Sequence, residues 1–191
     1  DTGLTSSAPR VLALIGPPGA GCSSVGRAVA TAMDLPVLDL ARRVADELGT
    51  GPDLALVAVP EAEYRRVESR TAISLLDRAV AQGAVVVLGS GCLADPQTRR
   101  RLEDVRGHDR PHRVVVALTC ATRVLTTRNG LDAPRSVALG TVHHQFVQML
   151  HERESQCREL ADIVVDTSST TPQEAGEQVI GAMLSAFFHH S

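Results

Sequence analysis

The sequence predicts an α/β fold in which a doubly wound sheet of five parallel strands carries helices on both faces. Short apolar runs alternate with longer amphipathic stretches along the 191 residues, which is the rhythm of βαβ units. The apolar runs are rich in Val, Leu and Ile, the composition of buried strands. A glycine-rich turn stands between the first run and the first helical stretch. These three observations together predict the doubly wound class.

The first half of the chain supplies three of the strands. Residues 11–16 form an unbroken apolar run, and a helical stretch over 22–33 follows the glycine-rich turn. A shorter apolar run at 36–39 precedes helical patterns near 41–48 and over 61–82. The run at 84–88 is almost pure valine and ends in a turn of small residues, so it predicts the third strand.

The second half continues the alternation. Helices are predicted over 95–104, near 121–129 and over 142–160, and strands over 113–118 and 162–166. The segment 129–141 has turn formers and no clean period. The last helix is expected to begin at Thr171, as the N-cap, with Pro172 at its first position and to end near residue 188.

Composition narrows the function classes. The net charge of −3 gives no sign of the basic surface typical of nucleic-acid or membrane binding, and an aromatic content of 2% leaves few side chains for stacking on bases. No run of apolar residues is long enough to span a membrane. All 19 basic residues are Arg, which excludes a lysine base, Schiff base or phosphate clamp.

The organisation expected is one domain over 10–191, after a disordered tail over 1–9. Four cysteines without a C-x-x-C pair favour free thiols in a reducing cytoplasm. Because the chain does not begin with Met, the sequence leaves open a further N-terminal domain or a protein partner.

The strongest local signal is the segment 16–23, which reads Gly-Pro-Pro-Gly-Ala-Gly-Cys-Ser. Gly16, Gly21 and Ser23 fit the Walker A pattern G-x-x-x-x-G-K-[ST], and Cys22 stands at its lysine position. The backbone N–H groups of such a loop, with the helix dipole, bind an anion without a lysine. The alternative is a structural turn that binds nothing.

With this loop, segments downstream give the chain a resemblance to shikimate kinases, of the nucleoside-monophosphate-kinase-like P-loop group, over about 11–183. Their order and spacing carry the resemblance. The matching segments are Val25-Gly26-Arg27, Asp39, 63–68, 88–91, Arg128, Arg135, 152–158, 161–162, 165–167 and Pro172.

The resemblance implies binding of ATP or ADP, Mg²⁺ and a small carboxylic acid. The implied nucleotide-binding residues are Gly16, Gly19, Gly21, Cys22, Ser23, Ser24, Arg128, Arg135 and Pro172, and the implied Mg²⁺ residues are Ser23 and Asp39. The implied substrate-binding residues are Arg65, Gly89, Ser90, Gly91 and Arg153. A substrate-binding region near 41–82 and a lid near 129–141 follow from the same resemblance.

The chain also departs from the family pattern. Cys22 occupies the position of the Walker lysine, and Ala41 that of the catalytic aspartate. Ser90 interrupts a triple glycine, Cys157 replaces a tyrosine, and Arg135 lacks the Pro-Leu-Leu that follows it in the family. Loss of one charge donor lowers a rate by about 10²–10³, and loss of a general base by about 10²–10⁴. These departures predict a pseudokinase that binds a small carboxylate as a sensor or scaffold.

Two other functions stay open at this stage. In the first, the chain is an active kinase for a shikimate- or quinate-like acid, with an arginine as the cation and Asp39 or Glu68 as the base. In the second, the thiol of Cys22, at a helix N-terminus, has a lowered pKa and acts as a nucleophile. A further reading places each of Arg65 and Arg153 in a surface or helix-face salt bridge, with Glu61, Glu63 and Glu68 close to Arg65 in the sequence.

Overall fold

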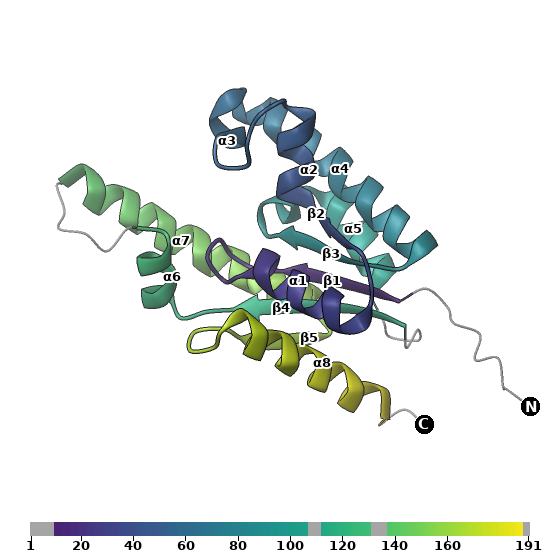
Figure 1. Ribbon diagram of the computed structural model, residues 1–191. Helices are drawn as coiled ribbons and strands as arrows, with labels where there is room; N and C mark the ends of the chain where they lie inside the picture. The colour runs from purple at the N-terminus through teal and green to yellow at the C-terminus, as the bar shows by residue number, and fades with distance from the viewer. Residues whose placement is uncertain (1–9, 107–111, 131–136, 189–191) are drawn as a thin grey trace, which may run out of the picture.

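The computed structural model describes residues 10–106, 112–130 and 137–188 (Figure 1). Its centre is one sheet in which all strand pairs are parallel, in the order β2-β3-β1-β4-β5. The strands are β1 Val11–Ile15, β2 Val37–Asp39, β3 Ala84–Gly89, β4 Arg113–Thr119 and β5 Ile163–Asp166. Each lies within a residue or two of its predicted position, so the predicted five-stranded parallel sheet is confirmed.

Helices cover both faces of this sheet, as predicted. They are α1 Cys22–Met33, α2 Leu40–Glu47, α3 Ala55–Ala58, α4 Glu61–Gln82, α5 Pro96–Val105, α6 Thr122–Arg128, α7 Val137–Leu160 and α8 Pro172–Phe188, with the 3₁₀ turn η1 Gly91–Ala94. Helices α1 and α8 pack together on one face (Figure 1). Helices α4 and α5 pack together on the other.

The side chains of β1 point alternately to the two faces of the sheet, so they belong to two different core layers. Val11, Ala13 and Ile15 belong to the layer that includes Leu76 and Leu102 of α4 and α5. Leu12 and Leu14 belong to the layer under α1 and α8. The five β1 side chains are at most 1% exposed. Burial of both faces is why these strands read as unbroken apolar runs.

Three local features differ from the prediction. The short helix α3 was not predicted, because four residues are too few to show a helical period. Helix α7 begins at Val137, where the prediction placed its start at 142. The 3₁₀ turn η1 follows β3 directly. The N-cap of α8 is confirmed, since Glu174 N–H donates to Thr171 Oγ1 at 3.1 Å.

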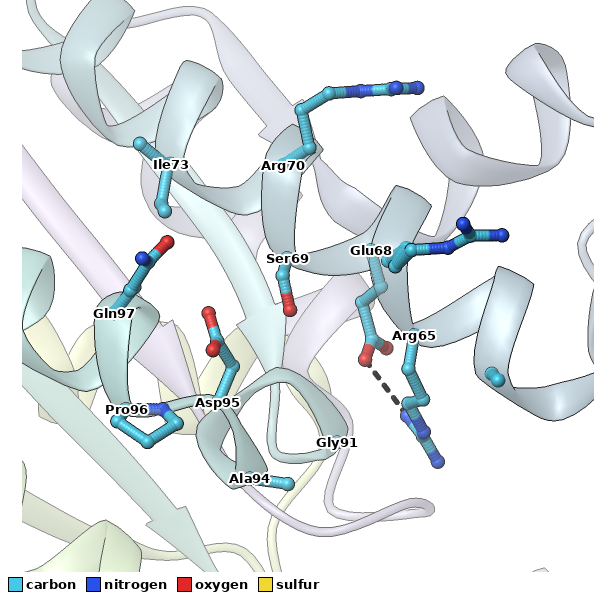
Figure 2. Close-up of a pocket in the computed structure, with 12 residues that line it drawn as sticks. Arg65, Glu68, Ser69, Arg70, Ile73, Gly91, Ala94, Asp95, Pro96 and Gln97 are labelled. Carbon is cyan, nitrogen blue, oxygen red and sulfur yellow. Dashed lines mark hydrogen bonds and ion pairs between the residues drawn. The ribbon is translucent and has the colours of Figure 1, made fainter.

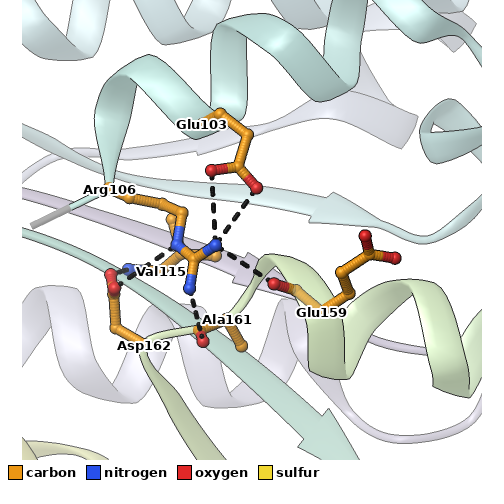
Figure 3. Close-up of polar contacts among 6 residues, drawn as sticks. All are labelled: Glu103, Arg106, Val115, Glu159, Ala161 and Asp162. Atoms are coloured by element: carbon orange, nitrogen blue, oxygen red, sulfur yellow. Dashed lines mark hydrogen bonds and ion pairs between the residues drawn. The ribbon is translucent and has the colours of Figure 1, made fainter. Parts of the chain in front are cut away.

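The C-terminal end of α7 is fixed by Arg106 (Figure 3). Its Nη atoms donate to the carbonyls of Glu159 and Ala161 at 3.1 and 3.2 Å and to Glu103 at 3.1 Å. Its Nε lies 3.5 Å from Asp162 Oδ1, and Asp162 Oδ2 accepts from the backbone N–H of Val115 at 2.9 Å. One guanidinium therefore ties α5, α7 and β4 together.

None of the helices in the described part of the chain is both long and apolar enough to cross a membrane. The predicted tail over 1–9 lies outside the described residues, as do residues 131–136 of the predicted lid.

Candidate functional site

A cavity of about 390 Å³ opens beside the carboxyl ends of β1, β2 and β3, where the loop 16–21 leads into α1. In doubly wound sheets, ligands bind at this edge. The cavity brings together thirteen of the positions singled out in the sequence. They are Gly16, Gly19, Gly21, Cys22, Ser23, Ser24, Asp39, Ala41, Arg65, Gly89, Ser90, Gly91 and Arg153.

The loop itself is shaped by its backbone. Gly19 and Gly21 take φ values of 88° and 92°, in the left-handed region that side chains with a Cβ rarely adopt. Gly21 is the N-cap of α1 and has no capping side chain. A ligand at the start of this 12-residue helix therefore meets free backbone N–H groups and the positive end of the helix dipole.

Three successive carbonyls of the loop accept hydrogen bonds from side chains outside it. Asn129 Nδ2 donates to Pro18 O at 3.0 Å, Arg128 Nη1 to Gly19 O at 2.9 Å, and Thr167 Oγ1 to Ala20 O at 2.8 Å. We call these three residues the loop pins. Because the loop pins hold these three carbonyls, the loop already has its ligand-binding conformation before any ligand binds.

Asn129 and Thr167 were not predicted as site residues. Thr167 stands in a segment that carries the resemblance, but nothing in the sequence singles out Asn129. Arg128, predicted to bind the nucleotide, donates to the carbonyls of Gly19 and Thr167. A second cavity of about 290 Å³ places Arg128 beside Pro172, Thr171 and Gly19. Arg135, also predicted to bind the nucleotide, lies outside the described residues.

The oxygen pair predicted for Mg²⁺ is assembled. Ser23 Oγ donates to Asp39 Oδ2 at 2.8 Å. Asp39 also caps α2, since Arg42 N–H donates to its Oδ1 at 3.4 Å. One hydroxyl and one carboxylate fit Mg²⁺, which takes few protein ligands and keeps several waters. The described residues contain no cluster of three or more His, Cys, Asp or Glu suited to a metal.

The expectation of a lowered pKa at Cys22 is wrong. Burial, together with the neighbouring Cys157 and Asp39, raises the pKa of this thiol to about 12. The sulfur lies so close to Gly16 that a Cβ on that glycine would be 3.0 Å from it. Desolvation of the thiolate therefore outweighs the favourable backbone hydrogen bond, and thiol chemistry at Cys22 has no support.

Arg65 is held by its neighbours on α4. Its Nη1 donates to Glu68 Oε1 at 2.8 Å, and its guanidinium lies 5.5 Å from the centre of the Tyr64 ring. Burial lowers the pKa of Arg65, but the bond and charge of Glu68 outweigh it, so the net pKa is raised. A Cβ on Gly91 would lie 2.6 Å from Arg65 Nη1, so a larger residue there would move the guanidinium from this position.

Arg153 is held more loosely. Its Nη1 donates to Ser90 Oγ at 3.4 Å, and among the described residues it forms no ion pair. Burial, followed by the like charge of Arg65, lowers the pKa of Arg153. Two guanidinium groups thus share one half-buried cavity, which excludes the reading of Arg153 as an ordinary surface salt bridge.

A larger cavity of about 690 Å³ lies between α4 and the start of α5 (Figure 2). Arg65, Glu68 and Gly91 line both cavities, and the ion pair in Figure 2 forms part of the wall between them. Its other walls come from Ser69, Arg70 and Asp95 among others. This cavity was not predicted from the sequence.

A glycine loop between the central strand of a parallel sheet and a helix, beside a paired serine and aspartate, defines a protein with the P-loop kinase fold. The family model for shikimate kinase matches residues 18–184. The chain therefore belongs to the shikimate kinase family.

The relatives agree with this assignment. The chain is 33% identical to a shikimate kinase of Thermobifida fusca over 87% of its own length and 90% of the relative's. It is 27% identical to a shikimate kinase of Rhodococcus jostii, over 92% and 98%. Among solved structures, shikimate kinase from Acinetobacter baumannii in complex with shikimate has a TM-score of 0.76 at 21% identity, covering 93% of this chain and 94% of that one. Shikimate kinase from Aquifex aeolicus has a TM-score of 0.71 at 18% identity, covering 92% and 97%.

Proposed function

We propose that this member of the shikimate kinase family binds a small carboxylate beside its phosphate loop and is impaired in phosphoryl transfer to shikimate. The observation that carries the proposal is the single cavity lined by Arg65, Arg153 and the loop, with Cys22 and Ala41 at the two positions where catalytic charges are expected. The ion pair with Glu68 balances the charge of Arg65, so the charge of Arg153 is left for a ligand.

The planar guanidinium groups suit a carboxylate. Each arginine offers several N–H donors in a fixed plane, and a carboxylate accepts two of them side by side. Arg65 is oriented by Glu68 and Tyr64, so its remaining donors are fixed in direction. Ser90, Gly89 and Gly91 border the same space from the end of β3.

The loop side is proposed to hold ATP or ADP. Gly16, Gly19, Gly21, Ser23 and Ser24 surround the phosphate position, and Ser23 with Asp39 offers oxygen ligands to Mg²⁺. Arg128 and Pro172 border the neighbouring cavity, where a base would lie. Bound Mg²⁺ would neutralise phosphate charge, which is the contribution it makes in phosphoryl transfer.

Impairment follows from two missing groups. A thiol that is neutral at physiological pH replaces the cation at the phosphates, and a methyl group replaces a carboxylate base. Losses of about 10²–10³ and about 10²–10⁴ are expected from the two changes. Binding without turnover suits a sensor or a scaffold, whose output passes to a protein partner.

The test is ADP release from Mg·ATP and shikimate by the native chain, by Cys22→Lys and by Cys22→Lys combined with Ala41→Asp. The native chain should show negligible shikimate-dependent release, and the double variant should gain about 10²-fold or more. Calorimetric titration with shikimate and quinate measures carboxylate binding separately. Ordinary turnover by the native chain, near 10 s⁻¹ in order of magnitude, contradicts the impairment. Failure of every carboxylate to bind overturns the proposal as a whole.

A second candidate is an active kinase for a hydroxylated ring acid. The intact contact between Ser23 and Asp39 favours it, as does 33% identity to a shikimate kinase. In this case Arg128 or Arg135 supplies the cation and Asp39 or Glu68 the base. ADP release by the native chain with shikimate or quinate, abolished in Arg153→Met, would establish this candidate in place of the first.

A further inference from the structure

The cavity that holds the two arginines is also lined by carbon. Ala41, Leu56 and the ring of Tyr64 line the same 390 Å³ as Arg65 and Arg153, and we call these three residues the carbon wall. They come from the start of α2, the short helix α3 and the start of α4. Three apolar groups from separate helices give a ligand an apolar surface.

Helix α3 adds apolar surface at the mouth of this cavity. Leu56 lines the cavity and is 58% exposed, while its neighbours Leu54 and Val57 are 60% and 78% exposed. Contiguous exposed apolar side chains beside a cavity are typical of a binding site whose ligand covers them.

Several polar side chains along the cavity already have partners. Asp39 accepts from Ser23 Oγ and from Arg42 N–H, and Glu68 accepts from Arg65. Ser90 Oγ accepts from Arg153. The methyl group of Ala41 and the side chain of Leu56 offer nothing to a hydroxyl. A ring hydroxyl placed against Ala41 and Leu56 would lose its water without gaining a partner from them, and such a loss is unfavourable.

From these observations we infer that the preferred ligand is a carboxylate on an apolar six-membered ring, with its carboxylate on Arg65 and Arg153 and its ring against the carbon wall. The inference deepens the proposed function and rests on it. A polyhydroxylated ring is disfavoured because its hydroxyl groups face Ala41 and Leu56, whereas an unsubstituted ring buries only carbon there.

The test compares two matched ligands by calorimetric titration of the native chain. Cyclohex-1-ene-1-carboxylate has the ring and carboxylate of shikimate and lacks its three hydroxyl groups. We expect it to bind about ten- to a hundredfold more tightly than shikimate, the range in which one wall of a pocket discriminates. Shikimate binding equally well or better overturns this inference and leaves the carboxylate site standing. Failure of both to bind overturns the proposed function itself.

Two variants sharpen the result. Ala41→Asp should narrow or reverse the preference, because it offers a hydroxyl partner and places a charge against the apolar ring. Leu56→Asn should weaken binding of the unsubstituted ring about tenfold without affecting shikimate to the same degree. Leu184→Asn is the matched control, since Leu184 is 52% exposed on α8 and does not line the cavity. An unchanged ligand preference in both Ala41→Asp and Leu56→Asn contradicts the inference.

Discussion

The two sides of the site are built in different ways. On the loop side, the groups offered to a ligand are backbone N–H groups, and three loop pins hold the backbone by its carbonyls. On the opposite side, the groups offered are the side chains of Arg65, Arg153 and the carbon wall. A backbone site survives substitution of the residues that form it, because every residue except proline carries the same N–H. A side-chain site changes its chemistry with each substitution.

This difference explains where the chain departs from an ordinary kinase. The loop keeps its turn although Cys22 stands at the lysine position, since the glycine conformations and the pins do not depend on that side chain. On the opposite side, the proposed change in ligand preference depends on the side chain at a single position, Ala41. The following predictions test this contrast, from the largest expected effect to the smallest.

The largest effect is expected at the thiol of Cys22. With a pKa of about 12, the thiol stays protonated at pH 7, and its thiolate fraction rises tenfold with each pH unit up to that value. Alkylation by iodoacetamide at pH 7 should therefore be about a thousandfold slower than for free cysteine, whose pKa is about 8.5. Mass spectrometry of the Cys22 peptide gives the rate. A rate that levels off near pH 9 would show that the loop dipole, and not burial, controls this thiol.

The next effect concerns the free energy of unfolding, at a residue that does not line the site. Arg106→Met removes the cation that joins α5, α7 and β4 and leaves Asp162 partly buried without it. We expect the free energy of unfolding to fall by about 2–4 kcal/mol. Urea denaturation measures the change. Arg70→Met is the control, because its ion pair with Glu47 is largely exposed and should contribute under about 1 kcal/mol. Equal effects of the two variants would contradict a structural role for Arg106.

Arg153→Met separates binding from stability. A charged hydrogen bond to the ligand contributes about 1.5–3 kcal/mol, so carboxylate affinity should fall about ten- to a hundredfold. The free energy of unfolding should not fall, since the variant removes a half-buried cation that is repelled by Arg65. Titration calorimetry and urea denaturation measure the two quantities. Arg158→Met, on the same helix but paired with Glu154, should leave the affinity unchanged.

The smallest effect is expected at a loop pin. Asn129→Ala removes the donor to Pro18 O and should lower the free energy of unfolding by about 1 kcal/mol. Affinity for ADP should fall severalfold, while carboxylate affinity stays unchanged. Thr127→Ala is the control, because its hydroxyl bonds only within its own helix, to Arg123 O. An equal loss of affinity for ADP and for the carboxylate would mean that the loop and the arginines do not act separately.

The sequence predicts the fold better than the contacts within the site. The valine-rich strands and the loop glycines have local patterns, and both are confirmed. The strand order depends on which parallel strands pair across the chain, and no local pattern reveals it. The error at Cys22 has the same origin. The helix N-terminus is visible in the sequence, whereas the burial that dominates the pKa of Cys22 is created by the tertiary fold. The electrostatic effect of Cys157, the second cause, comes from 135 positions further along the chain.

Asn129 illustrates the same limit. It lies 111 positions from the carbonyl it binds, and its type is ordinary at the end of a helix. Arg65 and Arg153 were predicted from resemblance to a family, and the structure adds that, among the described residues, Arg65 forms an ion pair and Arg153 does not. That difference depends on Glu68, one helical turn from Arg65, which the sequence suggested only as a salt-bridge partner or a base.

The two sides of the site nevertheless share a contact. Gly16 N–H, at the start of the loop, donates to Gly89 O, at the end of β3, at 3.2 Å. A carboxylate ligand that displaces Gly89 therefore also displaces Gly16, the first residue of the loop. Thermodynamic reciprocity then requires that a nucleotide changes carboxylate affinity by the same factor as the carboxylate changes nucleotide affinity. If the protein is impaired in phosphoryl transfer as proposed, this hydrogen bond still gives one ligand a means to report the presence of the other.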